Sequence, residues 1–171
     1  RPVLDGGGVA PNVAIEALED PPIVAALKKD HLLFKYVNEY ITKSQQPDTI
    51  LDLKFQDFEQ LLNFLKTKSF EYETESETKF KELKSIAESE GYIDEIGEEL
   101  ESIVGAIEAE KKDDANQNRS KIIRIIEEDL AQRLFFQEGK ARQRLKNDPE
   151  IKEAIALIND GERYNSLLQP K

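Results

Sequence analysis

The spacing of apolar side chains predicts helices along most of this 171-residue chain. Within residues 20–43, one face of an amphipathic helix is marked by Ile23, Leu27, Phe34, Val37 and Ile41. Asp20 is suited to cap this helix, and Pro21-Pro22 suits its first turn. After a break at residues 46–48, a second apolar set predicts another helix over about residues 56–68.

The middle of the chain carries stronger local signals. Thr74, followed three residues later by Glu77, matches a capping box, and Gly91 is placed to end the helix that begins there. The side chains that continue this helix are Phe80, Leu83, Ile86 and Ala87. The next helix has apolar residues at alternating spacings of three and four, as in a coiled-coil seam: Ile93, Ile96, Leu100, Ile103 and Ile107. This seam requires a partner helix.

The last part of the chain supplies a candidate partner. Residues 111–118 are polar and suit the turn of a hairpin, and an apolar stripe over residues 122–134 predicts a return helix that extends toward Leu145. Asp148 begins a further helix through Ile158, and a last turn follows Gly161. The sequence therefore predicts an all-α domain of about six helices with one long antiparallel helical hairpin, in which residues 122–134 face the seam.

Residues 1–19 differ from the rest of the chain. They contain Gly6-Gly7-Gly8, and Val9, Val13 and Ile15 alternate at about period two, which predicts a loop and then a short extended piece. A single strand cannot satisfy its own backbone groups, so it must pair with something. No second convincing strand follows in the sequence, so we expect its partners upstream, in a longer protein.

Composition narrows the possible partners. The chain is 39% apolar and 35% charged, with a net charge of −11. Residues 71–110 hold 14 acidic and 3 basic side chains, whereas residues 119–146 hold 8 basic and 4 acidic ones. An acidic protein repels phosphate backbones, so nucleic acid is not an expected partner, and the basic residues 140–146 suit a helix C-terminus. No apolar run approaches the length of a membrane span.

Candidate chemistry is sparse. His31 is the only histidine, it lies within a predicted helix, and no Gly-x-Ser-x-Gly motif accompanies it. Ser76 and Lys79 fit a Ser-x-x-Lys pattern, but they lie in an acidic, solvated stretch where a lysine has no reason to lose its proton. The chain has no cysteine. We therefore predict no catalytic residue.

Metal and cofactor sites are not predicted either. The carboxylate clusters at residues 71–77 and 94–101 lack the Glu-x-x-His pairs of helical metal sites, and they are interpreted as solvated helix faces. Gly6-Gly7-Gly8 lacks the Lys-Ser/Thr that completes a phosphate-binding loop.

The segment Arg1-Pro-Val-Leu-Asp-Gly-Gly-Gly-Val-Ala-Pro-Asn-Val13 resembles the end of the catalytic domain in carboxyl-terminal processing (tail-specific) serine peptidases. It departs from them at Val9, where Ile is usual, and at Asn12, where Asp is usual. Residues 70–76, 133–139 and 148–155 resemble the helical tail of the Bacteroidetes-type group.

The resemblance implies two parts: residues 1–19 as the extended end of a protease domain, and residues 20–171 as a helical C-terminal domain. It implies a parent with a PDZ domain, a Ser-Lys dyad upstream of Arg1, polypeptide substrates, and a place in the periplasm or cell envelope. The leading hypothesis is a non-catalytic domain that packs on the protease core, dimerises or guides substrate. A free-standing helical adaptor or chaperone-like module is the alternative, and a hydrolase acting alone is a third.

Overall fold

The computed structural model describes residues 11–15 and 19–169, and in this part of the chain it contains nine α-helices and no strand. The helices are α1 (Pro22–Lys29), α2 (Leu32–Lys43), α3 (Phe58–Thr67), α4 (Glu75–Glu90), α5 (Ile93–Lys111), α6 (Asp114–Gln117), α7 (Arg119–Asn147), α8 (Pro149–Asn159) and α9 (Gly161–Leu168). The predicted all-α class is confirmed. None of the described helices is both long and apolar enough to cross a membrane.

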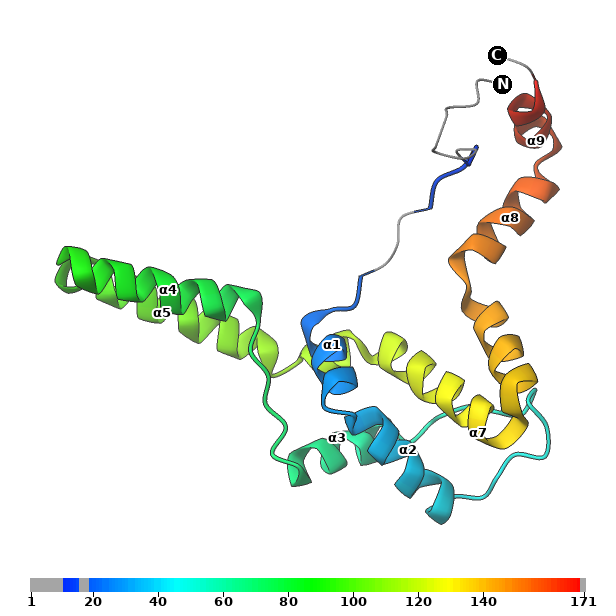
Figure 1. The fold of residues 1–171 in the computed structure, drawn as a ribbon, viewed down its shortest axis with the longest axis horizontal. Helices are drawn as coiled ribbons and strands as arrows, with labels where there is room; N and C mark the ends of the chain where they lie inside the picture. Colours follow the sequence, from blue (N-terminus) through cyan, green and yellow to red (C-terminus); the bar gives the residue numbers. More distant parts are fainter. Residues whose placement is uncertain (1–10, 16–18, 170–171) are drawn as a thin grey trace, which may run out of the picture.

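The hydrophobic core lies in a body formed by α1, α2, α3 and the first half of α7 (Figure 1). The fully buried side chains include Val24, Leu27, Val37, Phe58, Leu61, Ile122 and Ile126. Leu53 and Phe55 of the connection between α2 and α3 are also buried. Tyr36 joins these elements, since its ring lies 5.9 Å from the Phe55 ring and 5.4 Å from the Phe64 ring.

The first predicted helix, over residues 20–43, is two helices. The chain bends at His31, whose φ of 56° is in the left-handed region, which histidine tolerates better than most residues. The prediction that Asp20 caps the helix is also wrong, because Pro21 is the capping residue. The Asp20 carboxylate instead accepts hydrogen bonds from Lys28 at 2.5 Å and pairs with Lys121 at 3.1 Å, and the Lys28 ammonium holds the pKa of Asp20 below its usual value.

Helix α7 bends sharply at Phe135 and Phe136, which have non-helical backbone angles. Its second half returns alongside the first (Figure 1) and is joined to it by polar contacts. Gln143 is buried and donates to Glu127 at 2.7 Å, Lys140 donates to Gln132 at 2.8 Å, and Arg144 lies 3.4 Å from Glu128. We call residues 127–146 the elbow.

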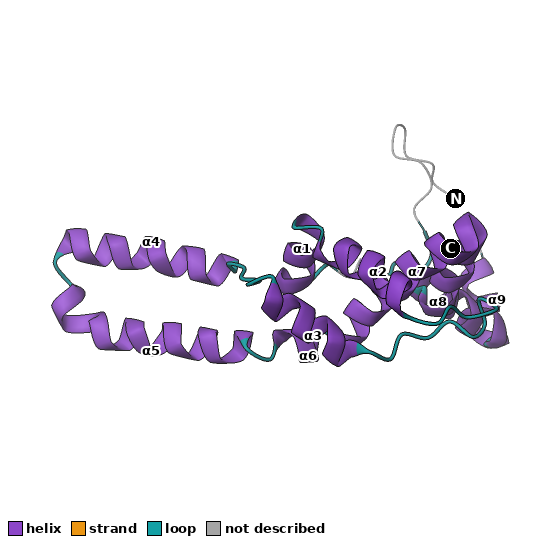
Figure 2. Ribbon diagram, turned by 90° about the horizontal axis from the view of Figure 1, so that it is seen from below, coloured by secondary structure: helices purple, strands orange, loops and turns teal. Residues whose placement is uncertain are grey.

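The long antiparallel hairpin is present, but its predicted partners are wrong. Helix α5 packs along α4, and the chain reverses at Gly91, whose φ of 81° is in the left-handed region. Residues 111–118, predicted as the hairpin turn, instead contain the end of α5 and the short α6. Figure 2 shows α4 and α5 projecting side by side from the body. We call residues 75–111 the arm.

Helices α8 and α9 project from the end of α7 as a separate extension, which we call the tail (Figure 1). Asp148 caps α8 as predicted, accepting from the backbone N–H groups of Glu150 at 2.8 Å and Ile151 at 3.1 Å. The side-chain amide of Asn12 donates to the Leu167 carbonyl at 3.2 Å, so the segment 11–15 contacts the tail at Asn12. These residues, with Val13 and Ile15, form no strand, and Val9 lies outside the described residues.

Candidate interaction site

A polar cluster holds the base of the arm. Thr74 and Glu77 form the predicted capping box: the Thr74 hydroxyl accepts from the Glu77 N–H at 3.2 Å, and the Glu77 carboxylate accepts from the Thr74 N–H at 2.6 Å. Lys111, at the end of α5, donates to Glu77 at 2.7 Å and to the Tyr72 carbonyl at 2.5 Å. The Tyr72 hydroxyl donates to Asp114. The two ends of the arm are thus tied to each other and to the start of α6.

Two pKa values are shifted in this cluster. Partial burial alone would raise the pKa of Glu77, but the hydrogen bonds from Lys111 and Thr74 outweigh it and hold that pKa below its usual value of 4.5. Burial, followed by the hydrogen bond to Asp114, raises the pKa of Tyr72. Glu77 therefore carries its charge and Tyr72 keeps its proton at neutral pH. Both states maintain the contacts at the base.

The two helices of the arm touch along a narrow contact. Its least exposed side chains are Ala87 in α4 and Leu100 in α5, both of which are buried. Ile93, Val104 and Ile107 are half-buried. Helices α4 and α5 make their main contact with each other rather than with the body, so the rest of each helix surface faces solvent.

A second set of apolar side chains lies beside this contact. Leu83, Ile86, Ile96 and Ile103 are 49%, 53%, 38% and 50% exposed. Each of the four directly precedes, in the sequence, a residue that lies in the contact between the helices. These contact residues, which are less exposed than the four, are Lys84, Ala87, Gly97 and Val104.

These four side chains lie on one side of the arm. A residue one position earlier is rotated by about 100° around its helix. In two antiparallel helices, both the chain direction and the direction toward the partner are reversed, so this rotation turns both sets toward the same side of the pair. The opposite side, one position later, carries Ser85, Glu88, Glu98, Glu101 and Gly105. The arm is therefore amphipathic, and we call the side with Leu83, Ile86, Ile96 and Ile103 the apolar face.

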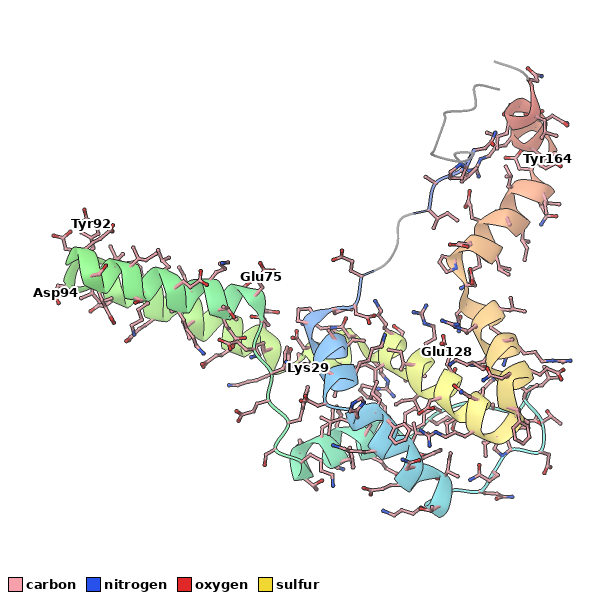
Figure 3. All side chains as sticks on the ribbon, in the orientation of Figure 1. Lys29, Glu75, Tyr92, Asp94, Glu128 and Tyr164 are labelled. Atoms are coloured by element: carbon pink, nitrogen blue, oxygen red, sulfur yellow. The ribbon has the colours of Figure 1, made fainter. Side chains whose placement is uncertain are left out.

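The arm is also strongly acidic toward its tip. Nine Asp or Glu residues and no Lys or Arg lie between Lys84 and Lys111. The ion pairs that the described residues form on the arm are Lys79–Glu82 at 2.9 Å, Lys81–Glu73 at 2.8 Å and Lys111–Glu77 at 2.7 Å. All of them involve residues before Lys84 or at Lys111, so the carboxylates nearer the tip form no ion pair within the described chain. In Figure 3 the labels Tyr92 and Asp94 mark this tip.

The tail carries a second exposed apolar surface. Helices α8 and α9 have no buried residue, and their side chains Ile155, Ile158, Tyr164 and Leu168 are exposed. Arg163 of α9 and Glu153 of α8 form an ion pair at 2.6 Å, which fixes the two helices to each other. Tyr164 is labelled in Figure 3, far from the arm. The molecule thus exposes apolar side chains at two separate ends.

Comparison with known families decides what this molecule is. Residues 23–158 match the family described as "Probable PDZ-protease, C-terminal helical domain". The chain belongs to this family. No curated protein and no solved structure matches it. The matched residues include the body, the arm and nearly all of α8, so the arm lies within the part of this C-terminal helical domain that defines the family.

The structure places His31 outside the arm, whereas Ser76 and Lys79 both lie in α4. His31 lies exposed between α1 and α2, beside a cavity of about 300 Å³ that Phe34, Asp129 and Lys140 also line. Ser76 is exposed in the first turn of α4, and Lys79 donates to Glu82. Among the described residues, no group of three or more His, Asp or Glu side chains is placed to hold a metal. Lys79 thus pairs with Glu82 rather than with Ser76, and His31 belongs to another part of the fold.

Sequence reasoning missed the apolar face of the C-terminal helical domain. It assigned Ile96 and Ile103 to the seam, and it named Leu83 and Ile86 only among the apolar residues that continue their helix, whereas the structure leaves all four exposed. The available signal was the width of the stripes, since Ile86-Ala87 and Ile103-Val104 are adjacent apolar pairs that one partner helix cannot cover.

Proposed function

We propose that this domain is a non-catalytic part of a serine-type carboxyl-terminal processing endopeptidase, and that its arm guides polypeptide substrates toward the parent's PDZ and protease domains. The family match supports the protease context. The Ser-Lys dyad belongs to the parent, upstream of Arg1, and we place the parent in the periplasm or cell envelope on the resemblance of its sequence.

The observation that carries this proposal is the exposed apolar face of the arm. Single exposed apolar side chains are ordinary, but four on one side of a projecting hairpin form a surface of the kind that binds proteins. The arm projects away from the body (Figure 2), so a polypeptide can reach this face without displacing the core. Unfolded or tail-like segments expose apolar side chains of their own, which this face can cover.

The tail is the part of the domain that we propose to contact the parent's protease domain. Residues 11–15 contact α9 through Asn12 and Leu167, so the tail touches the segment that precedes the helical domain in the sequence. The exposed Ile155, Ile158 and Leu168 are then suited to pack on the parent's protease core. The body and arm would extend beyond that contact and hold the apolar face at a distance from the active site.

The test uses the full-length parent with two kinds of substrate. In the double variant Leu83→Ser/Ile103→Ser, we expect KM for an unfolded protein substrate to rise about tenfold, with kcat little changed, because the lost contacts contribute to binding only. Cleavage of a short peptide that cannot span from the active site to the arm should be unaffected.

The matched control is Ser85→Ala/Gly105→Ser, which changes the opposite side of the same two helices. It should behave like the unmodified enzyme with both substrates. Circular dichroism of each variant establishes that the arm remains helical. Equal KM values for the protein substrate in the apolar-face variant and the control would exclude guidance by the arm.

A further inference from the structure

We infer that the segment held by the arm is amphipathic and positively charged, with Lys or Arg residues flanking apolar ones. This inference rests on the proposed function, because it names the chemistry of the polypeptide that the apolar face binds. The apolar face alone would accept many apolar segments. The charges around it select among them.

Carboxylates lie within and around the apolar face. Glu99 stands between Ile96 and Ile103 on α5, three residues after one and four before the other, so it shares their side of the helix. Glu90 follows Ile86 by four residues on α4. Lys79, which precedes Leu83 by four residues, already pairs with Glu82 at 2.9 Å. A bound segment therefore meets apolar side chains bordered by negative charge.

An anionic or neutral partner does not match this surface. Nine carboxylates lie between Lys84 and Lys111, and an acidic segment or an anionic lipid surface would add like charges beside them. A cationic segment would form ion pairs at the rim while its apolar side chains cover the face. Complementary charge of this kind also speeds association.

A second copy of this chain is a poorer occupant. Pairing two arms would bring together two regions that each carry 12 acidic and 4 basic residues. The basic elbow is the other candidate in a second copy, but its cations already have partners within the chain. Arg142 pairs with Glu138 at 2.8 Å, and Lys140 and Lys146 donate to Gln132 and Gln143, each at 2.8 Å.

The spacing of the apolar face sets the pattern of the ligand. Ile96 and Ile103 are seven residues apart, which is two helical turns or roughly 10 Å. A helical ligand with apolar side chains at positions i, i+3 or i+4, and i+7 would match this length when it lies along the apolar face. Lys or Arg at the flanking positions would then reach Glu90 and Glu99.

The test measures binding of three labelled synthetic peptides to the 171-residue chain by fluorescence anisotropy. Each peptide has about 18 residues, enough for a helix to form on binding. The first carries Leu at the spacing given above with Lys around it, the second replaces Lys by Glu, and the third replaces Leu by Ser. We expect the first to bind at least about tenfold more tightly than either of the others, and to weaken as salt is raised.

Two variants separate the inference from the proposed function. Glu90→Gln/Glu99→Gln should reduce the preference for the Lys peptide over the Glu peptide, while Leu83→Ser/Ile103→Ser should weaken binding of both. Equal affinity for the Lys and Glu peptides, lost in the apolar-face variant, would overturn the cationic ligand and leave guidance by the arm standing. Binding that the apolar-face variant does not change would overturn both. A dimer in sedimentation that this variant abolishes would identify a second copy as the occupant and overturn the inference.

Discussion

Gly139 lies where the two halves of α7 come together. A Cβ atom built on it would lie 2.7 Å from the Ala131 carbonyl oxygen and closer still to Cβ of Phe135. Neither atom belongs to a flexible side-chain end, so the backbone of the elbow would have to shift. We expect Gly139→Ala to destabilise the domain by about 1 to 3 kcal/mol in urea unfolding.

Gly105 is the matched control for this substitution, because nothing lies within 4 Å of a Cβ built on it. Alanine is a better helix former than glycine, so Gly105→Ala should leave the global free energy of unfolding unchanged or raise it by up to about 1 kcal/mol. If Gly139→Ala proved equally neutral, the close return of α7 at the elbow would be wrong.

Glu77 makes the arm sensitive to acid. Its pKa in the folded state lies below 4.5, so its contribution to stability is complete above about pH 4.5 and is lost as the pH falls through the lower folded value. We expect Glu77→Gln to cost about 1 kcal/mol at pH 7 and to cost less at a second pH below about 4.5, where the Glu77 contribution declines. Urea unfolding followed by helicity at both pH values measures this. Glu75→Gln, an exposed position in the same turn, should show no such convergence.

At the scale of helices, the arm should open independently of the body. Leu100 is the buried residue of α5, and the arm is otherwise held by half-buried contacts and by the cluster at its base. Leu100→Ala removes a buried side chain at a cost of about 2 to 5 kcal/mol. We expect hydrogen exchange in α4 and α5 to accelerate, while amides of the core around Phe58 and Ile126 keep their protection.

Leu83→Ala tests the same element without touching its contact, since Leu83 is exposed. Exchange in the arm should then stay as in the unmodified chain. Acceleration of similar size in the two variants would place Leu83 in the contact and contradict the apolar face.

The sequence predicted helices well where their signals are local. The capping box at Thr74, the end of α4 at Gly91 and the cap at Asp148 depend only on neighbouring residues, and all three are confirmed. Predicting which helices pack against each other was harder, because a periodic apolar stripe shows that a helix face is covered but does not show which element covers it. The seam of α5 was assigned to residues 122–134, although the short reversal at Gly91 brings α4 closer.

Helix interruptions at positions without Gly or Pro were also not predicted. Residues 23–41 keep one helical period across His31, and α7 keeps an apolar stripe up to its bend at Phe135-Phe136. At both places tertiary packing overrides a continuous local preference. The apolar face was not predicted for a related reason. The sequence shows which side chains are apolar, but only the folded structure shows which of them remain exposed.

At the scale of the whole molecule, the body should fold without the tail. Helices α8 and α9 bury no side chain, and their main contact is with each other, so removing them exposes little apolar surface. A chain ending at Asn147 should unfold cooperatively with a Tm within about 2 °C of the full 171 residues, because surface changes of this kind rarely exceed about 0.5 kcal/mol. Circular dichroism during heating measures this.

The same truncation should behave differently in the parent. If the tail packs on the protease core, its removal exposes that contact, and limited proteolysis should release the helical domain faster than in the full-length enzyme. The variant Ile155→Ser/Ile158→Ser should reproduce this faster release, while Lys152→Ser on α8 serves as the control. A truncated parent that remained as resistant as the intact one would show that the tail is not the attachment. The body or the connecting residues 11–21 would then have to hold the domain in place.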